Sequence, residues 1–239
     1  CYAVSDYPDR DFTFGGTLVD QGDLFLHGNE DETKALNYLG NTHGGMLNIG
    51  ADWYIFYHRQ TNQHSYSRQA CAERLEHPAP GVFKQAEVTS CGLNGGPLSG
   101  TGRYEARIAC NLWSKNGVAR YDQKFDKKAH PYFTQTGEDR MENGDQYIAN
   151  MRDGAVAGFK YFEFGGEKRI SLTISGVCSG IVEVSHTPDF KAVIARIPVS
   201  AKAEQVNPEG AFAPQKGTQP LYFRYTGEGA MNFHTFEMK

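Results

Sequence analysis

The stretch from Asn41 to Arg59, Asn-Thr-His-Gly-Gly-Met-Leu-Asn-Ile-Gly-Ala-Asp-Trp-Tyr-Ile-Phe-Tyr-His-Arg, decides the fold class of this sequence. Two runs rich in aromatic and β-branched residues flank the Gly-Ala-Asp turn at 50–52, which is the pattern of a β-hairpin. A third strand is expected over 64–73 and a fourth over 81–88. Four antiparallel strands within about 50 residues are typical of one propeller blade.

Composition narrows the class of protein. The chain has 239 residues and a net charge of −4, with no basic run that would collect phosphates, so nucleic acid is disfavoured as a partner. No apolar window approaches the roughly 20 residues of a membrane-spanning helix. Aromatic residues make up 13% of the chain, which argues against disorder. With 27 Gly and 10 Pro between short apolar runs, the sequence predicts an all-β protein.

The chain divides into two β modules. A Gly-rich stretch at 91–102 interrupts the blade pattern, and short strands with regular turn signals follow from residue 147 to the end, which predicts a β-sandwich. We therefore expect propeller blades over 1–90, a linker with connecting strands over 91–144, and the sandwich over 145–239. No helix of three turns is expected.

Specific motifs now suggest a family. Four of them resemble the late blades of family 43 glycoside hydrolases: Tyr2-Ala-Val-Ser-Asp6, Phe14-Gly-Gly16, Asn41-Thr-His-Gly44, and Trp53 to Arg59 continuing through Ser67-Arg-Gln69. The ending from Pro220 to Phe233 is similar to family 6 carbohydrate-binding modules. The resemblance implies the last one or two blades of a five-bladed β-propeller, followed by a jelly-roll-like β-sandwich. It also implies a parent glycosidase of the arabinofuranosidase or xylosidase type, which cleaves arabinose-, xylose- or galactose-containing plant polysaccharides with inversion.

The resemblance assigns no catalytic residue to this chain. In this family three carboxylates on the early and middle blades act as general base, pKa modulator and general acid, and these lie upstream of the stretch that begins at Tyr2. An inverting enzyme needs its acid and base far enough apart to admit a water. We expect turn roles for Asp6 and Asp9 and a strand-edge role for Glu73, and we expect no turnover by this chain alone. The alternative is a non-catalytic carbohydrate-binding or structural β-protein.

Three residues are candidates for substrate binding. The resemblance implies that His43 points down the propeller axis and contacts a hydrated calcium or a water network; alternatively it is a strand-start histidine bonded to backbone. The resemblance also implies that Arg68 contacts the sugar at the catalytic subsite. Arg59 competes for this role, and the alternative for either arginine is a salt bridge at a blade edge. His58 and His64 are expected to be polar surface groups.

Aromatic side chains pose the same choice between sugar platform and packing. Because alternate residues of a strand face opposite ways, most of the rings in Trp53–Tyr57 are expected to be blade core. Six rings of the second module remain open between an exposed platform and core packing: Trp113, Tyr161, Phe164, Tyr222, Tyr225 and Phe233.

The remaining expectations concern cofactors and partners. We expect at most a structural, axial calcium, held by His43 through water, and no other cofactor. The expected partner is an oligo- or polysaccharide, with no nucleic acid and no membrane. An unfinished blade leaves an open sheet edge, so we also expect a missing N-terminal propeller segment or self-association. The five Cys are interpreted as mostly buried thiols. The substrate class favours a secreted or periplasmic location, and a cytoplasmic location is the alternative.

Overall fold

The computed structural model describes residues 1–62, 67–120, 129–137 and 144–239. Within these residues the chain is built of strands, with three short 3₁₀ turns at Glu32–Lys34, Gly92–Asn94 and Ala106–Ile108. None of the described segments forms a helix with the length and apolarity needed to cross a bilayer. The all-β prediction is confirmed.

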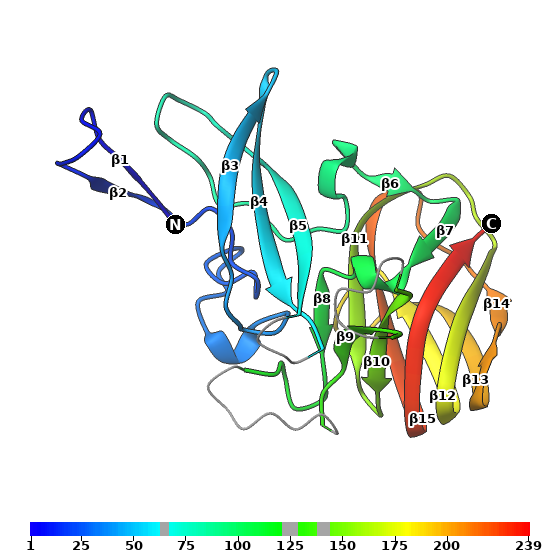
Figure 1. Cartoon of the computed structure of the whole chain (residues 1–239). Coiled ribbons are helices and arrows are strands. Elements are labelled where there is room, and N and C mark those ends of the chain that lie inside the picture. Colours follow the sequence, from blue (N-terminus) through cyan, green and yellow to red (C-terminus); the bar gives the residue numbers. More distant parts are fainter. Residues whose placement is uncertain (63–66, 121–128, 138–143) are drawn as a thin grey trace.

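The N-terminal part contains a two-stranded ribbon and a three-stranded antiparallel sheet (Figure 1). The ribbon pairs β1 (Tyr2–Val4) with β2 (Thr13–Gly16), and the sheet has the order β3 (Gly44–Ile49), β4 (Asp52–Gln60), β5 (Arg68–Leu75). Along β4, burial alternates as a strand requires: every second side chain is buried and the intervening ones are half-buried. The third predicted strand is therefore confirmed in its described part.

The fourth predicted strand, over 81–88, is wrong. Pro78 and Pro80 precede it, and proline removes a backbone donor and interrupts ladder pairing. The backbone that follows instead forms hydrogen bonds with the loop after β2. The N–H of Ala86 donates to the carbonyl of Leu18 at 2.8 Å, and the N–H of Val88 donates to a carboxylate oxygen of Asp23 at 2.7 Å. Consequently β5 is an edge strand of this sheet.

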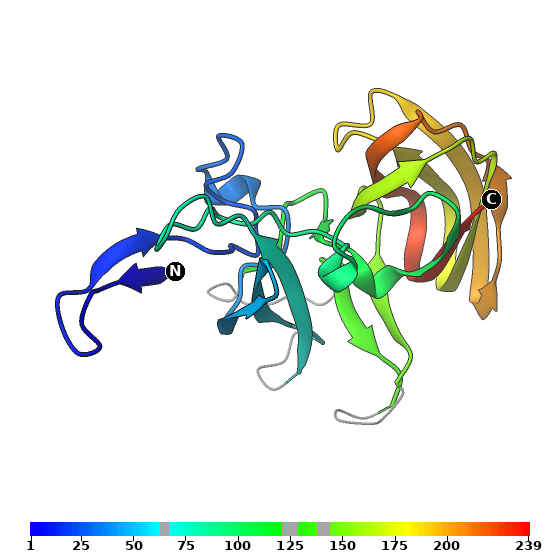
Figure 2. The same cartoon turned by 90° about the horizontal axis from the view of Figure 1, so that it is seen from above.

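The C-terminal part is one ten-stranded, strongly curved sheet (Figures 1 and 2). Its strands are β6 (Leu98–Ser99), β7 (Gly102–Glu105), β8 (Asn111–Trp113), β9 (Tyr132–Gln135), β10 (Gln146–Met151), β11 (Val156–Phe164), β12 (Arg169–Ser185), β13 (Val193–Val206), β14 (Glu209–Ala211) and β15 (Gly217–Met238). The last strand organises the sheet: β15 pairs with β12 on one edge and with β11, β10 and β7 in turn on the other.

Short strands were expected from residue 147 to the end, but two strands of this sheet are long. β12 runs through both 169–174 and 180–184, and β15 runs through both 219–225 and 233–238. Glycines allow these strands to continue where they approach each other. A Cβ on Gly229 would lie 2.0 Å from the carbonyl oxygen of Val177, and Gly229 has a φ of 79°.

A cluster of phenylalanine rings forms the centre of this sheet's core. Phe159, Phe223, Phe233 and Phe236 have no exposed surface, and the ring centroids of Phe159 and Phe236 lie 4.8 Å apart. Burial of four such rings supplies a large share of the hydrophobic stabilisation of this module. The open question for Phe233 is thus answered in favour of packing, as it is for Phe164, Tyr222 and Tyr225, which are also buried.

The division at residues 90 and 144 remains a prediction, although the strands within 91–144 bear on it. β6, β7, β8 and β9 all hydrogen-bond to strands of the C-terminal sheet. We therefore propose that the second module begins near residue 98. The five Cys are all free thiols, of which Cys110 and Cys178 are buried.

Candidate functional site

His43 lies immediately before β3 and faces His58 on the neighbouring strand. Its Nδ1 is 2.9 Å from Nε2 of His58, and its backbone N–H donates to the same Nε2 at 3.2 Å. His43 itself is exposed. Of the two glycines that follow, Gly44 is required for close approach, because a Cβ there would lie 2.5 Å from the Phe56 carbonyl oxygen, whereas Gly45 has open space around it.

The hydrogen bonds around His58 define its protonation state. Because Nε2 accepts from the His43 N–H, a neutral ring carries its proton on Nδ1, and that Nδ1 is buried without a hydrogen-bond partner among the described residues. Burial, Arg68 and His43 lower the pKa of His58 below its ordinary value. His58 was expected to be a surface group, and it is instead the half-buried residue at the centre of this cluster.

Arg68 begins β5 and reaches the same histidine from the other side. It pairs with Gln60 in the β4–β5 register, so its side chain lies on the same sheet face as His58. It is half-buried, its Nη1 donates to the carbonyl of Ser67 at 3.0 Å, and its charge contributes to the lowered pKa of His58. The predicted His43 and Arg68 thus both neighbour His58, which we call the histidine–arginine cluster (His43, His58 and Arg68). His64 lies outside the described residues.

A pocket of about 250 Å³ opens along β3; His43 lines it, whereas His58 and Arg68 do not. His43, Thr42 and the two glycines form one wall, and Tyr2 and Leu18 form part of the other. β3 is an edge strand whose residues are all exposed, including Met46, Leu47 and Ile49. An exposed apolar edge is a surface that other chain segments cover or that drives association.

Arg59 points the opposite way from Arg68 and is buried. Its Nη1 and Nη2 donate to the carbonyls of Ala109 and Arg107, both at 2.6 Å, and its Nε donates to Gln69 at 2.8 Å. Its guanidinium also lies 3.6 Å from the ring centroid of Phe133. A substrate-binding role for Arg59 stays a prediction; from these contacts we propose that it joins the blade to the second module.

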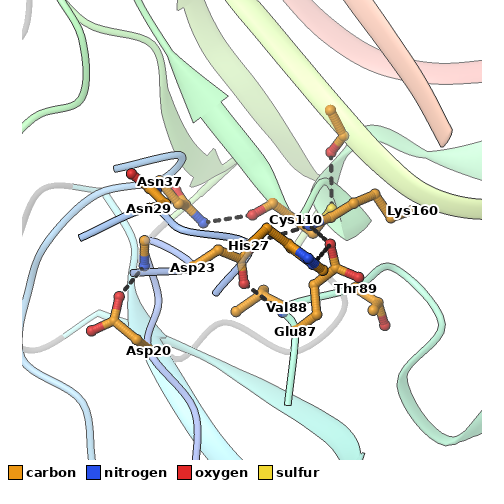
Figure 3. A network of polar contacts seen from close by, with 12 residues as sticks. Asp20, Asp23, His27, Asn29, Asn37, Glu87, Val88, Thr89, Cys110 and Lys160 are labelled. Atoms are coloured by element: carbon orange, nitrogen blue, oxygen red, sulfur yellow. Dashed lines mark hydrogen bonds and ion pairs between the residues drawn. The ribbon is translucent and has the colours of Figure 1, made fainter. Parts of the chain in front are cut away.

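A second, buried polar network joins the two parts of the chain (Figure 3). Nζ of Lys160, on β11, lies 2.8 Å from Oδ2 of Asp23 and 2.8 Å from Oε1 of Glu87, and the lysine side chain is 3% exposed. Tyr161 donates to the other oxygen of Glu87 at 2.8 Å. Burial alone would lower the pKa of Lys160, but the neighbouring Cys110, Asp23 and Glu87 raise it above its ordinary value, so the ammonium stays charged.

Glu73 is the most perturbed carboxyl group of the blade. It is 4% exposed, accepts from the N–H and hydroxyl of Thr89 at 2.8 and 2.6 Å, and accepts from the Tyr57 hydroxyl at 3.3 Å. Burial raises its pKa to about 7 despite these hydrogen bonds. It lies on an edge strand as expected, but its burial was not predicted, because its neighbours come from segments that are distant in sequence.

The comparisons with known proteins agree with the motifs. No protein-family model matches the sequence. The chain is 38% identical over 240 residues to a xylosidase/arabinosidase of Thermoclostridium stercorarium, an alignment that covers all of this chain and 50% of the relative. The chain therefore spans about half the length of the curated relative it matches.

Solved structures show the same correspondence in the fold. The whole chain superimposes on 47% of a family 43 arabinoxylan arabinofuranohydrolase from Bacillus subtilis, with a TM-score of 0.55 and 18% identity. The fold of the chain is thus similar to that of about half of this enzyme, and the resemblance stated from the motifs is confirmed. A carbohydrate-binding module, CsCBM6-3 from Clostridium stercorarium, covers 61% of the chain at a TM-score of 0.46 and 13% identity.

Proposed function

We propose that this chain forms part of a glycoside hydrolase that cleaves arabinose-, xylose- or galactose-containing plant polysaccharides by an inverting mechanism. The observation that carries the proposal is the 38% identity to a xylosidase/arabinosidase along the entire chain. The histidine–arginine cluster supports it, because two residues predicted from the motifs both neighbour His58, and one of them, His43, lines a pocket of about 250 Å³.

In this proposal Arg68 is the principal sugar ligand of the chain. A guanidinium presents several donors in a fixed plane, which suits neighbouring sugar hydroxyls. Loss of such a donor leaves sugar oxygens unpaired, at a cost of about 1–3 kcal/mol. The Nε2 of His58 already accepts from the His43 N–H, so His58 positions His43 rather than contacting sugar.

A structural calcium ion is part of this proposal. The described residues contain no group of three His, Cys, Asp or Glu side chains arranged to hold a metal ion. Calcium prefers six to eight oxygen ligands, so His43 would act on it only through a bound water. Any such ion would depend on oxygen ligands beyond this cluster.

The catalytic carboxylates are proposed to lie outside this chain, in the half of the relative that it does not cover. Asp6 and Asp9 are exposed in the loop between β1 and β2. Glu73 is buried and engaged by Tyr57 and Thr89. We therefore propose none of the three as the general acid or general base of an inverting pair.

The test is a binding titration in a longer polypeptide, in which this chain is joined to the half of the Thermoclostridium stercorarium relative that it does not match. Arg68→Ala is expected to weaken the binding of arabinose or xylose oligomers about tenfold or more, and His43→Ala less. If the longer polypeptide binds these oligomers but does not hydrolyse aryl-arabinosides or aryl-xylosides, the alternative of a non-catalytic carbohydrate-binding protein holds. If Arg68→Ala has wild-type affinity, the assigned role is wrong.

A further inference from the structure

A second cavity lies between β5 and the segments that lead into the C-terminal module. Its volume is about 350 Å³, near the lower end of the range of about 300–1,000 Å³ for ligand pockets. It is lined by β5, by residues 88–93 and by residues 107–109. The sheet order β3-β4-β5 places it on the opposite edge from His43, about 10 Å away across two strand spacings.

The edge of β5 supplies this cavity with backbone donors and acceptors. The N–H of His58 donates to the carbonyl of His43, so alternate residues of β4 direct their backbone groups toward β3 and the others toward β5. By the β4–β5 register, Cys71 and Glu73 pair with β4, and Ala70 and Ala72 direct their N–H and C=O groups away from the sheet. Neither alanine has a hydrogen-bond partner at these groups among the described residues.

Side chains add an apolar wall and a cationic group. Phe56 and Leu93 line the cavity, and Leu93 is 59% exposed. Arg107 is partly exposed; its Nε pairs with Glu105 and its Nη1 donates to Gln146 at 3.2 Å, which leaves Nη2 without a hydrogen bond to the described residues. The cavity thus combines flat apolar surface with both donors and acceptors.

We infer that this cavity is a second carbohydrate subsite, which takes one or two neutral pentose units of an oligosaccharide. Sugar hydroxyls both donate and accept, which matches the paired N–H and C=O groups of Ala70 and Ala72, and the apolar faces of a pentose ring match Phe56 and Leu93. The segment at 88–93 closes the cavity along β5, which favours a compact ligand over a long added strand. The choice of pentose rests on the proposed function; the site itself rests on the cavity.

The experiment uses the 239-residue protein with His43→Ala and Arg68→Ala, which removes the histidine–arginine cluster as a sugar site. Xylotriose is titrated by calorimetry, and saturable binding is expected. Ala70→Trp, which fills the cavity from the exposed side of β5, is expected to weaken this binding at least tenfold. Val177→Trp is the matched control, because Val177 is 68% exposed on β12 and lies outside the cavity.

Two results would overturn the inference directly. No binding in the His43→Ala and Arg68→Ala background contradicts it, as does equal binding by Ala70→Trp. If Ala70→Trp does not fold, Leu93→Asp replaces it with the same expectation. A dimer on gel filtration that Ala70→Trp abolishes would assign the edge to strand pairing instead. The proposed function is tested by Arg68 in the longer polypeptide, so its failure is distinct from failure here.

Discussion

Replacing Lys160 with Met tests whether the buried ion network holds the two parts of the chain together. The methionine has a similar length and no charge, so the substitution removes the ammonium while largely preserving volume. It leaves Asp23, whose side chain is 4% exposed, without its cationic partner. Glu87 loses its ion pair with the same ammonium group. Removing one partner of a buried pair is costly because the remaining charge is desolvated and uncompensated.

The expected loss of stability is about 3–5 kcal/mol, the range found when one member of a buried ion pair is removed. For a chain of this size each kcal/mol lowers the melting temperature by about 2–4 °C, so a decrease of roughly 6–20 °C is expected. Burial already raises the pKa of Asp23, and loss of Lys160 raises it further. The destabilisation should therefore grow as the pH rises, because more of the unpaired Asp23 must ionise.

Calorimetry and urea unfolding at pH 5 and pH 8 measure this effect. Lys202→Met is the matched control, since Lys202 is exposed on β13 and forms no ion pair among the described residues. Adding Asp23→Asn to Lys160→Met should recover a large part of the loss. If Lys160→Met changes the unfolding free energy by less than about 1 kcal/mol at pH 8, or if both lysine variants lose equal stability, the buried network does not hold the two parts of the chain together.

Three further predictions concern the blade. Burial raises the pKa of Glu73 from 4.5 to about 7, so its contribution to stability is complete below about pH 4.5 and is lost as the pH rises through 7. Relative to Glu73→Gln, the wild-type protein should therefore lose up to about 3 kcal/mol of unfolding free energy between pH 5 and pH 8, measured by urea unfolding. Parallel pH profiles of the two proteins would contradict this. Arg59→Met should cost about 2–4 kcal/mol in unfolding free energy, because it leaves the carbonyls of Ala109 and Arg107 without their donor, and wild-type stability would show that these bonds contribute little. In the longer polypeptide, Arg68→Ala should reduce oligosaccharide affinity more than His43→Ala does, as measured by calorimetry; wild-type affinity of Arg68→Ala together with weakened binding by Arg59→Ala would show that the wrong arginine was chosen.

Local patterns were enough to predict the strands of the blade. The alternation from Trp53 to Arg59 is a property of adjacent residues, and it appears directly as alternating burial in β4. The expected strand at 81–88 failed because its backbone donors bond to Asp23 and to Leu18, which lie some 65 residues earlier in the chain. The residues of a single segment do not predict hydrogen-bond partners that are so distant in sequence.

The candidate site was predictable only where local motifs indicated its residues. His43 and Arg68 stood out by their motifs, but the central position of His58 depends on the β3–β4 register, which pairs it with His43 across the turn. The buried network around Lys160 gave no signal in sequence, since its members come from a loop, an irregular segment and a strand of the other module. The difference between Arg59 and Arg68 was likewise decided by which face of the sheet packs on the second module.

Hydrolysis is compared for two polypeptides: this chain alone, and this chain joined to the half of the Thermoclostridium stercorarium relative that it does not match. The substrates are aryl-arabinosides and aryl-xylosides, and the quantity measured is kcat/KM. We expect turnover by the longer polypeptide and no turnover by the 239-residue chain. In the longer polypeptide, Arg68→Ala should lower kcat/KM about tenfold or more. Turnover by the 239-residue chain that is abolished by substituting one of its own Asp or Glu residues would contradict this expectation.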